Sequence, residues 1–144
     1  MKRFEFSLET VLHLRESQER EWENKLASVT GECARLRREI GGFKEEKSRC
    51  ALENTLRDVN SLMAVANYQA LMDRKADEAR RKLSLKEKER ERVLKDFIEA
   101  SKKRKILDKL KEKQHDEYHH ERNKYEEKMN DDLNISRRAR VNGG

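Results

Sequence analysis

Apolar residues recur every three and four positions from Leu8 to Phe43, and most positions between them are charged. The stripe alternates between two positions of a seven-residue repeat: Leu8, Leu12, Trp22, Leu26, Val29, Cys33, Leu36, Ile40 and Phe43. Only Arg15 and Glu19 interrupt it. An average spacing of about 3.5 residues keeps one narrow face of a helix turned toward a partner helix as the two supercoil. The pattern predicts a coiled coil, since a face this narrow cannot close a globular core.

A second stripe with the same spacing follows: Leu62, Val65, Met72, Ala76, Ala79, Leu83, Val93, Phe97, Ala100 and Leu107. Between the stripes the apolar phase is lost, and Asp58-Val59-Asn60-Ser61 supplies residues that favour turns and helix N-caps. Gly41 and Gly42 lie inside the first stripe, which keeps its phase across them, so they mark a soft point and no reversal. We expect a helix over about 7–57, a turn over about 58–61, a helix over about 62–138 and a frayed C-terminus.

Two long helices with a short connection favour an antiparallel hairpin. The predicted fold class is therefore all-α, a two-helix antiparallel coiled-coil hairpin that forms a single domain over residues 1–144. With the turn near residue 59, residue i faces roughly residue 118 minus i, which places Leu8 near Leu110. The segment after about Gln114 then has no partner within the chain.

That unpaired segment still carries an apolar seam of Tyr118, Tyr125, Met129 and Leu133. Three arginines follow it, Arg137, Arg138 and Arg140, near a helix C-terminus where the dipole favours cations. We expect the seam and the arginines to bind another protein. The alternative is that the arginines only cap the helix and keep the chain soluble.

Phe43, Tyr68 and Leu71 flank the predicted reversal. Apolar groups left partly exposed near a hairpin tip are candidate contacts for a partner protein. Packing between the two helices of the hairpin is the alternative for these three residues.

The composition fits the same fold. The chain has 44% charged residues, 34% hydrophobic residues and no proline in 144 residues, which is typical of long helices and coiled coils. Disorder is the competing reading of so polar a chain, but a seam sustained in phase argues against it. Cys33 and Cys50 would lie roughly 25 Å apart on one helix, too far for a disulfide, so we expect free thiols that serve as small apolar seam residues.

No catalytic pattern is apparent, because the sequence has no glycine-rich phosphate loop, no nucleophile elbow and no Cys-x-x-Cys motif. We expect no enzyme activity and no cofactor. His115 and His119 are four positions apart, with Asp116 and His120 beside them, and such a pair on a helix can share a metal ion. Two imidazoles on an exposed face lack the remaining ligands, so we predict solvated side chains and no metal site.

Residues 80–105 hold twelve basic and five acidic side chains. A basic stripe can bind phosphates, but here it overlaps the seam and groups no base-reading residues. We expect no nucleic acid as a partner, although a nucleic-acid-binding coiled coil remains one alternative and a generic scaffold or tether another. No apolar run approaches the ~20 residues that span a bilayer, and the N-terminus lacks the apolar region of a secretory signal, so we expect a cytoplasmic protein.

Both ends and the middle of the chain resemble the flagellar FliJ family, the small coiled-coil component of the type III flagellar export apparatus. The resemblance rests on Phe4-x-Phe6-x-Leu8-Glu9-x-Val11-Leu12-x-Leu14-Arg15, on Asn67-Tyr68-Gln69, and on Leu110-Lys111-Glu112 through Glu117-Tyr118, Glu121-Arg122, Glu126-x-Lys128 and Arg137-Arg138-x-Arg140. The chain departs from the family pattern at Asp131-Asp132, where the family more often has Asp-Glu.

The resemblance implies a stalk similar in fold to the coiled coil of the rotary ATP synthase gamma subunit. It implies that the paired N- and C-terminal helices sit in the hexameric export ATPase and that the chain contacts the membrane export gate protein. It also implies a role in cycling the export chaperones, on the cytoplasmic side of the inner membrane and attached there only through protein partners.

Overall fold

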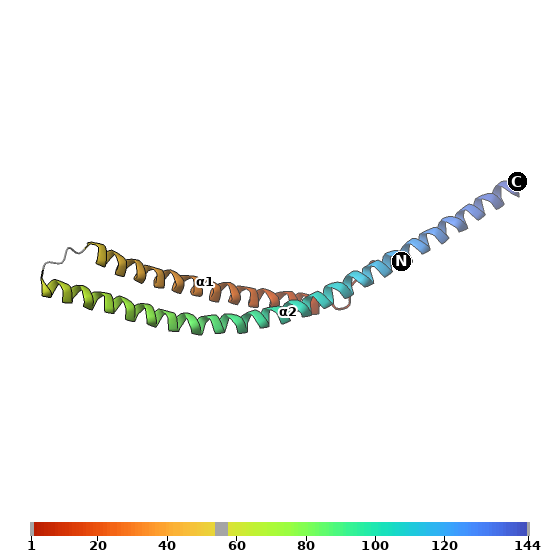
Figure 1. Cartoon of the computed structure of the whole chain (residues 1–144). Helices are drawn as coiled ribbons and strands as arrows, with labels where there is room; N and C mark the ends of the chain where they lie inside the picture. The colour runs from red at the N-terminus through yellow and green to blue at the C-terminus, as the bar shows by residue number, and fades with distance from the viewer. Residues whose placement is uncertain (1, 54–57, 144) are drawn as a thin grey trace. The chain divides into compact units, whose positions relative to one another are not determined.

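The computed structural model describes residues 2–53 and 58–143. They form two α-helices, α1 over Glu9–Glu53 and α2 over Val59–Asn142, and no strand occurs in these two ranges (Figure 1). The predicted all-α hairpin of two long helices is confirmed. α1 runs without a break through Gly41 and Gly42, as the unbroken phase of its apolar stripe predicts.

The start of each helix is set by a local hydrogen bond. The backbone N–H of Glu9 donates to the carbonyl of Phe6 (3.1 Å), and residues 2–6 before it are not helical. At α2, the N–H of Ser61 donates to Oδ1 of Asp58 (2.7 Å), which makes Asp58 the N-cap. The residues expected as a turn over 58–61 are thus an N-cap and the first helical turn.

The start of α2 differs from the prediction because of this N-cap. α2 begins at Val59 and ends at Asn142, where a helix over 62–138 was expected. Asp58 accepts a hydrogen bond from the amide of Ser61, one of the first free amides of α2, so the helix starts directly after Asp58. Residues 54–57, where the end of the first helix was expected, lie outside the described residues.

Contacts divide the chain into two compact units, and the prediction of one domain over residues 1–144 stays a prediction. One unit is Gln18–Ala100, which we call the hairpin unit. The other combines Met1–Ser17 with Ser101–Gly144, and we call it the terminal unit.

The core of the hairpin unit is a single seam between α1 and α2. Its buried residues are Val29, Cys33, Leu36, Ile40, Met72, Ala76, Ala79 and Ala100. All eight belong to the two predicted stripes. Cys33 is completely buried, as expected for a thiol that acts as a small apolar seam residue. Because each helix buries only one stripe, the rest of its surface is free to carry charge.

Polar pairs beside the seam fix the direction and register of the helices in this unit. Arg90 Nε donates to Thr30 Oγ1 (3.2 Å), Lys86 Nζ lies 2.6 Å from Glu32 Oε2, and Lys47 Nζ lies 2.9 Å from Asp73 Oδ2. Residue numbers rise along α1 as they fall along α2, so the helices are antiparallel. The residue numbers of Glu32 and Lys86 add up to 118, as predicted for two residues that face each other.

The same pair shifts the pKa values of both partners. The hydrogen bond from Lys86 lowers the pKa of Glu32, and the positive charge of Lys86 acts in the same direction. In return, hydrogen bonds to Glu32 and then Glu89 raise the pKa of Lys86. The hydrogen bonds from Ser61 lower the pKa of Asp58 at the N-cap of α2.

The buried seam generates a stability prediction. Leu36 is 3% exposed and Leu85 is 67% exposed. Leu36→Ala removes buried methyl groups and leaves a cavity, so it should lower the free energy of unfolding by roughly 2–4 kcal/mol. Leu85→Ala is the matched control and should change it by less than about 0.5 kcal/mol. Urea unfolding followed by circular dichroism measures both, and equal values would mean that the seam is assigned to the wrong face.

The pKa shifts predict how stability depends on pH. A carboxylate with a lowered pKa in the folded state stabilises the fold above its unfolded pKa, and this contribution is lost as the pH falls through the folded pKa. Glu32 has an ordinary pKa of 4.5, so wild type should lose melting temperature below about pH 4.5, and Glu32→Gln should lose less. For Lys86 the sign is opposite, and its contribution is lost only as the pH rises through its raised pKa.

Melting curves between pH 7 and pH 3 test this, with Glu23→Gln as the control at an exposed carboxylate. If Glu32→Gln and Glu23→Gln have the same pH dependence, the pair with Lys86 does not contribute to stability.

Candidate functional site

The N-terminal residues of the terminal unit pack against α2. The ring of Phe4 lies 5.1 Å from the ring of His115, edge to face, and 5.6 Å from the ring of Tyr118. The hydroxyl of Tyr118 donates to the carbonyl of Lys2 (2.5 Å). Phe6, two residues further along the chain, is buried. Residues 2–6 thus form a short non-helical segment that packs on α2, which we call the strap.

This strap corrects the prediction that the segment after Gln114 has no partner in the chain. Lys2 meets Tyr118 as Glu9 meets Lys111, so the non-helical residues 2–6 continue the antiparallel register of the hairpin and cover Tyr118. The alternation of Phe4 and Phe6 ahead of the heptads is the sequence signal that could have indicated an extended segment.

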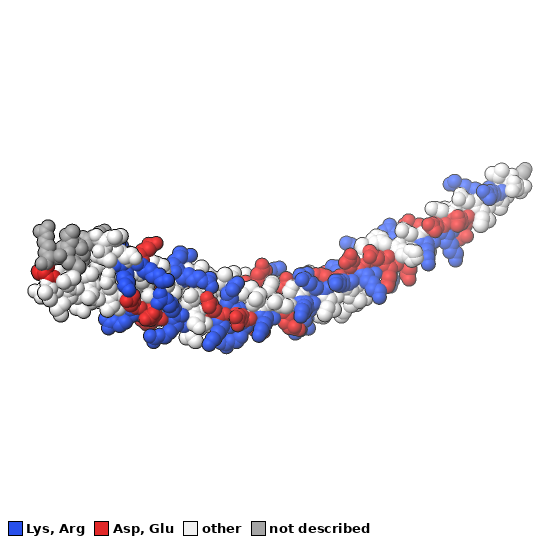
Figure 2. Space-filling view, in the orientation of Figure 1, with Lys and Arg blue, Asp and Glu red and all other residues white. Residues whose placement is uncertain are grey.

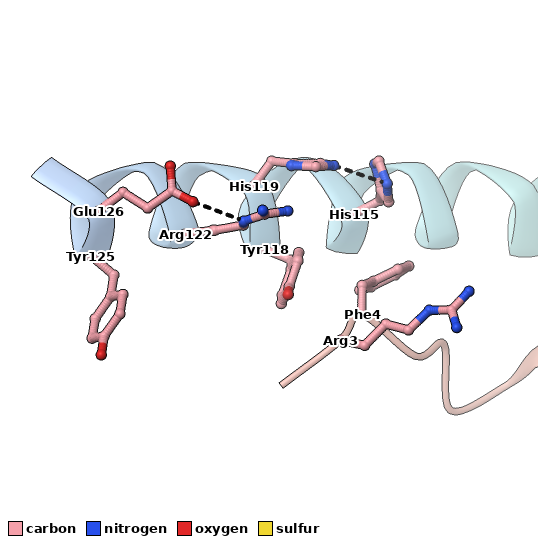
Figure 3. A pocket seen from close by; sticks show the side chains of 8 residues that line it. All are labelled: Arg3, Phe4, His115, Tyr118, His119, Arg122, Tyr125 and Glu126. Atoms are coloured by element: carbon pink, nitrogen blue, oxygen red, sulfur yellow. Dashed lines mark hydrogen bonds and ion pairs between the residues drawn. The ribbon is translucent and has the colours of Figure 1, made fainter. Parts of the chain in front are cut away.

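A groove of about 610 Å³ lies where the strap meets α2 (Figure 3). Its lining residues are Arg3, Phe4, His115, Tyr118, His119, Arg122, Tyr125 and Glu126. Arg122 Nε donates to Glu126 Oε1 (3.2 Å) at its far end. Figure 3 shows Tyr118 and Tyr125 projecting from the same side of α2. The groove is thus lined by aromatic side chains and by charged side chains of both signs.

Beyond this groove the apolar seam is open to solvent. Every described residue from 119 to 143 is exposed, including Tyr125 (48%), Met129 (47%) and Leu133 (54%). Arg137, Arg138 and Arg140 are exposed in the last turns of α2. The part of the seam without a partner in the described chain therefore begins at Tyr125, one heptad later than predicted.

The three candidates near the reversal differ in exposure. Phe43 and Tyr68 are half-buried, and the Tyr68 hydroxyl donates to Glu46 Oε1 (2.7 Å). Leu71 is 39% exposed. Tyr68 thus already has a polar partner in the hairpin, and Leu71 offers the most open apolar surface of the three.

A comparison with protein families identifies the relatives of this chain. The model of the flagellar FliJ protein family matches residues 4–143. The chain belongs to the flagellar FliJ protein family. The resemblance seen in the sequence is confirmed over essentially the whole chain.

Membership makes this FliJ-family chain a component of the flagellar protein export apparatus, in a family whose members are not enzymes. Searches of curated proteins and of solved structures returned no match.

The histidine pair of this FliJ-family chain is close enough to interact. Nε2 of His115 lies 3.1 Å from Nε2 of His119. Within residues 2–53 and 58–143, no group of three or more His, Cys, Asp or Glu side chains is arranged to hold a metal ion.

Several basic side chains of residues 80–105 form ion pairs along α2. Arg80 NH1 lies 2.7 Å from Asp77 Oδ1, Lys86 Nζ lies 3.1 Å from Glu89 Oε2, and Arg104 pairs with Asp108. Neutralised charges of this kind are typical of a solvated helix surface. No described helix is both long and apolar enough to cross a bilayer.

Proposed function

We propose that this FliJ-family chain is a stalk that docks in the hexameric export ATPase and promotes its assembly and activity. In the same proposal it contacts the membrane export gate protein and helps to cycle export chaperones. It works on the cytoplasmic side of the inner membrane, where protein partners hold it.

The exposed seam on α2 is the observation that supports the ATPase contact. Tyr125, Met129 and Leu133 continue the periodicity that α1 and the strap cover elsewhere, yet no described part of the chain packs on them. An aromatic and apolar row rimmed by charge is typical of a protein-binding surface. A ring lining of apolar residues with acidic residues at one end would complement the row and its terminal arginines.

A stalk of this kind can stimulate an ATPase without touching ATP. If it binds the assembled hexamer more tightly than separate subunits, mass action shifts the subunits toward the hexamer. The chain then needs no catalytic group and no cofactor. Its contribution is binding free energy from the seam and charge complementarity from Arg137, Arg138 and Arg140.

The gate contact is proposed for the end of the hairpin unit next to the reversal. Leu71 supplies exposed apolar surface there, with Phe43 half-buried on α1. Tyr68 is one turn before Leu71 on α2 and bonds Glu46, so it would hold the local geometry and present its ring edge. The chaperone role and the likeness to the gamma-subunit coiled coil are what the resemblance implies, and they stay predictions.

The ATPase contact is tested by charge reversal. Changing Arg137, Arg138 and Arg140 together to Glu should weaken stimulation of the cognate ATPase by about tenfold or more, because like charges would then face acidic residues of the ring. ATPase rates measured against stalk concentration give the effect, and sedimentation gives the hexamer fraction.

Lys102, Lys103 and Lys105 changed together to Glu are the matched control, since they are exposed basic residues of the same helix. This control should keep full stimulation, and both variants should keep the wild-type melting curve. Undiminished stimulation by the arginine variant would remove the arginines from the mechanism. A wild-type chain that fails to stimulate would favour a plain scaffold.

The gate contact is tested at two apolar side chains. Phe43→Ala combined with Leu71→Ala should weaken binding to the cytoplasmic domain of the gate protein and reduce motility, because apolar contact area is lost. Leu85→Ala removes an exposed leucine of the same helix and should leave both unchanged. Unchanged gate binding by the double variant, with helix content intact, would assign Phe43 and Leu71 to helix packing alone.

A further inference from the structure

The first four turns of α2 carry no charge. Residues 59–72 contain no Asp, Glu, Lys or Arg, in a chain that is 44% charged. Fourteen residues of average composition would carry about six charged side chains. Asp58 and Asp73 border the stretch on both sides. Packing in the hairpin explains one uncharged face of this segment, but it leaves the others unexplained.

The segment is apolar on two opposite faces. On the face toward α1, Val65 is half-buried and Met72 is buried. A second set, which we call the outer stripe, is exposed and consists of Val59, Leu62, Met63, Ala66 and Ala70. These positions are three, four and seven apart, so they lie on one face of the helix. Val59 is 69% exposed, Leu62 49% and Met63 59%.

The surface view agrees with this pattern. In Figure 2 uncharged side chains form a white area where α2 begins. Basic and acidic side chains alternate over the helices elsewhere in the same view. An exposed apolar face is retained in a soluble chain chiefly where a partner covers it.

We propose that the outer stripe binds one amphipathic α-helix of another export-apparatus component. The spacing of the stripe matches the seam by which α1 and α2 already pair, so the incoming helix completes a local three-helix packing. Ala66 and Ala70 leave room for the backbone of that helix to approach closely. Since the stripe has no charge, the contacting face of the partner is apolar as well.

Two other occupants fit the stripe less well. A membrane surface is disfavoured because residues 59–72 offer no Lys or Arg to anionic lipids. A second copy is disfavoured by area. The stripe spans roughly 17 Å of helix about 10 Å wide, far below the ~800 Å² per partner of a stable interface. A helix that belongs to a larger partner adds this contact to others.

This site is separate from the gate contact proposed above. The outer stripe contains none of Phe43, Tyr68 and Leu71, so variants of one surface leave the other intact. The Phe43 and Leu71 variant tests the gate contact, and crosslinking at Met63 tests the stripe, so either proposal can fail while the other stands.

The test places a photo-crosslinking amino acid at Met63 in the full-length chain. Purified export ATPase, gate cytoplasmic domain and an export chaperone are added one at a time, and the crosslinked residue is mapped by mass spectrometry. We expect one component to crosslink through the apolar face of a helix. Crosslinks to a second copy of the chain alone, binding only to anionic lipid vesicles, or no crosslink at all would each overturn the proposal.

A charge placed in the stripe supplies the matched variant. Ala66→Glu puts a carboxylate at the centre of the stripe, on an exposed position where Glu is a good helix former. It should lower the crosslinking yield at Met63 at least tenfold, because the carboxylate would be buried without a partner. Ser84→Glu also adds a carboxylate at an exposed position of the same helix, beyond the stripe, and should leave the yield unchanged. Equal yields for the two variants would overturn the proposal.

Discussion

Burial of one narrow apolar stripe per helix is the interaction on which this structure depends. Leu36, Ile40 and Met72 are buried in the seam, while most positions around them are charged and exposed. A stripe repeating at about 3.5 residues stabilises only when a second helix lies along it. The antiparallel hairpin supplies that helix within the same chain, and ion pairs such as Glu32 with Lys86 lie beside the seam in register.

The same constraint leaves most described side chains of the two helices on the surface, and the proposed contacts are surface contacts. α2 has 84 residues and α1 has 45, so α1 cannot cover all of the seam on α2. The strap of residues 2–6 extends the cover to Tyr118. Beyond it, Tyr125 and Met129 remain exposed, and this excess length is what the proposed ATPase contact uses.

Two stretches of exposed apolar surface on α2 fit different kinds of partner. The seam from Tyr125 onward is flanked by charges and ends in arginines, which suits a lining of mixed character. The outer stripe from Val59 to Ala70 contains no charged residue and suits a single apolar helix face. A component of the export apparatus that holds two partners at once would need such separate surfaces.

The sequence by itself determined the helical class, the two stripes and the antiparallel register, because heptad periodicity is a local property that every turn repeats. It also placed Tyr125, Met129 and the terminal arginines on a segment without a partner. Tertiary structure decided what periodicity does not encode. The strap of residues 2–6 covers Tyr118 through Phe4, because the contacts of this non-helical segment are set by the side chains it packs on and leave no repeat in the sequence.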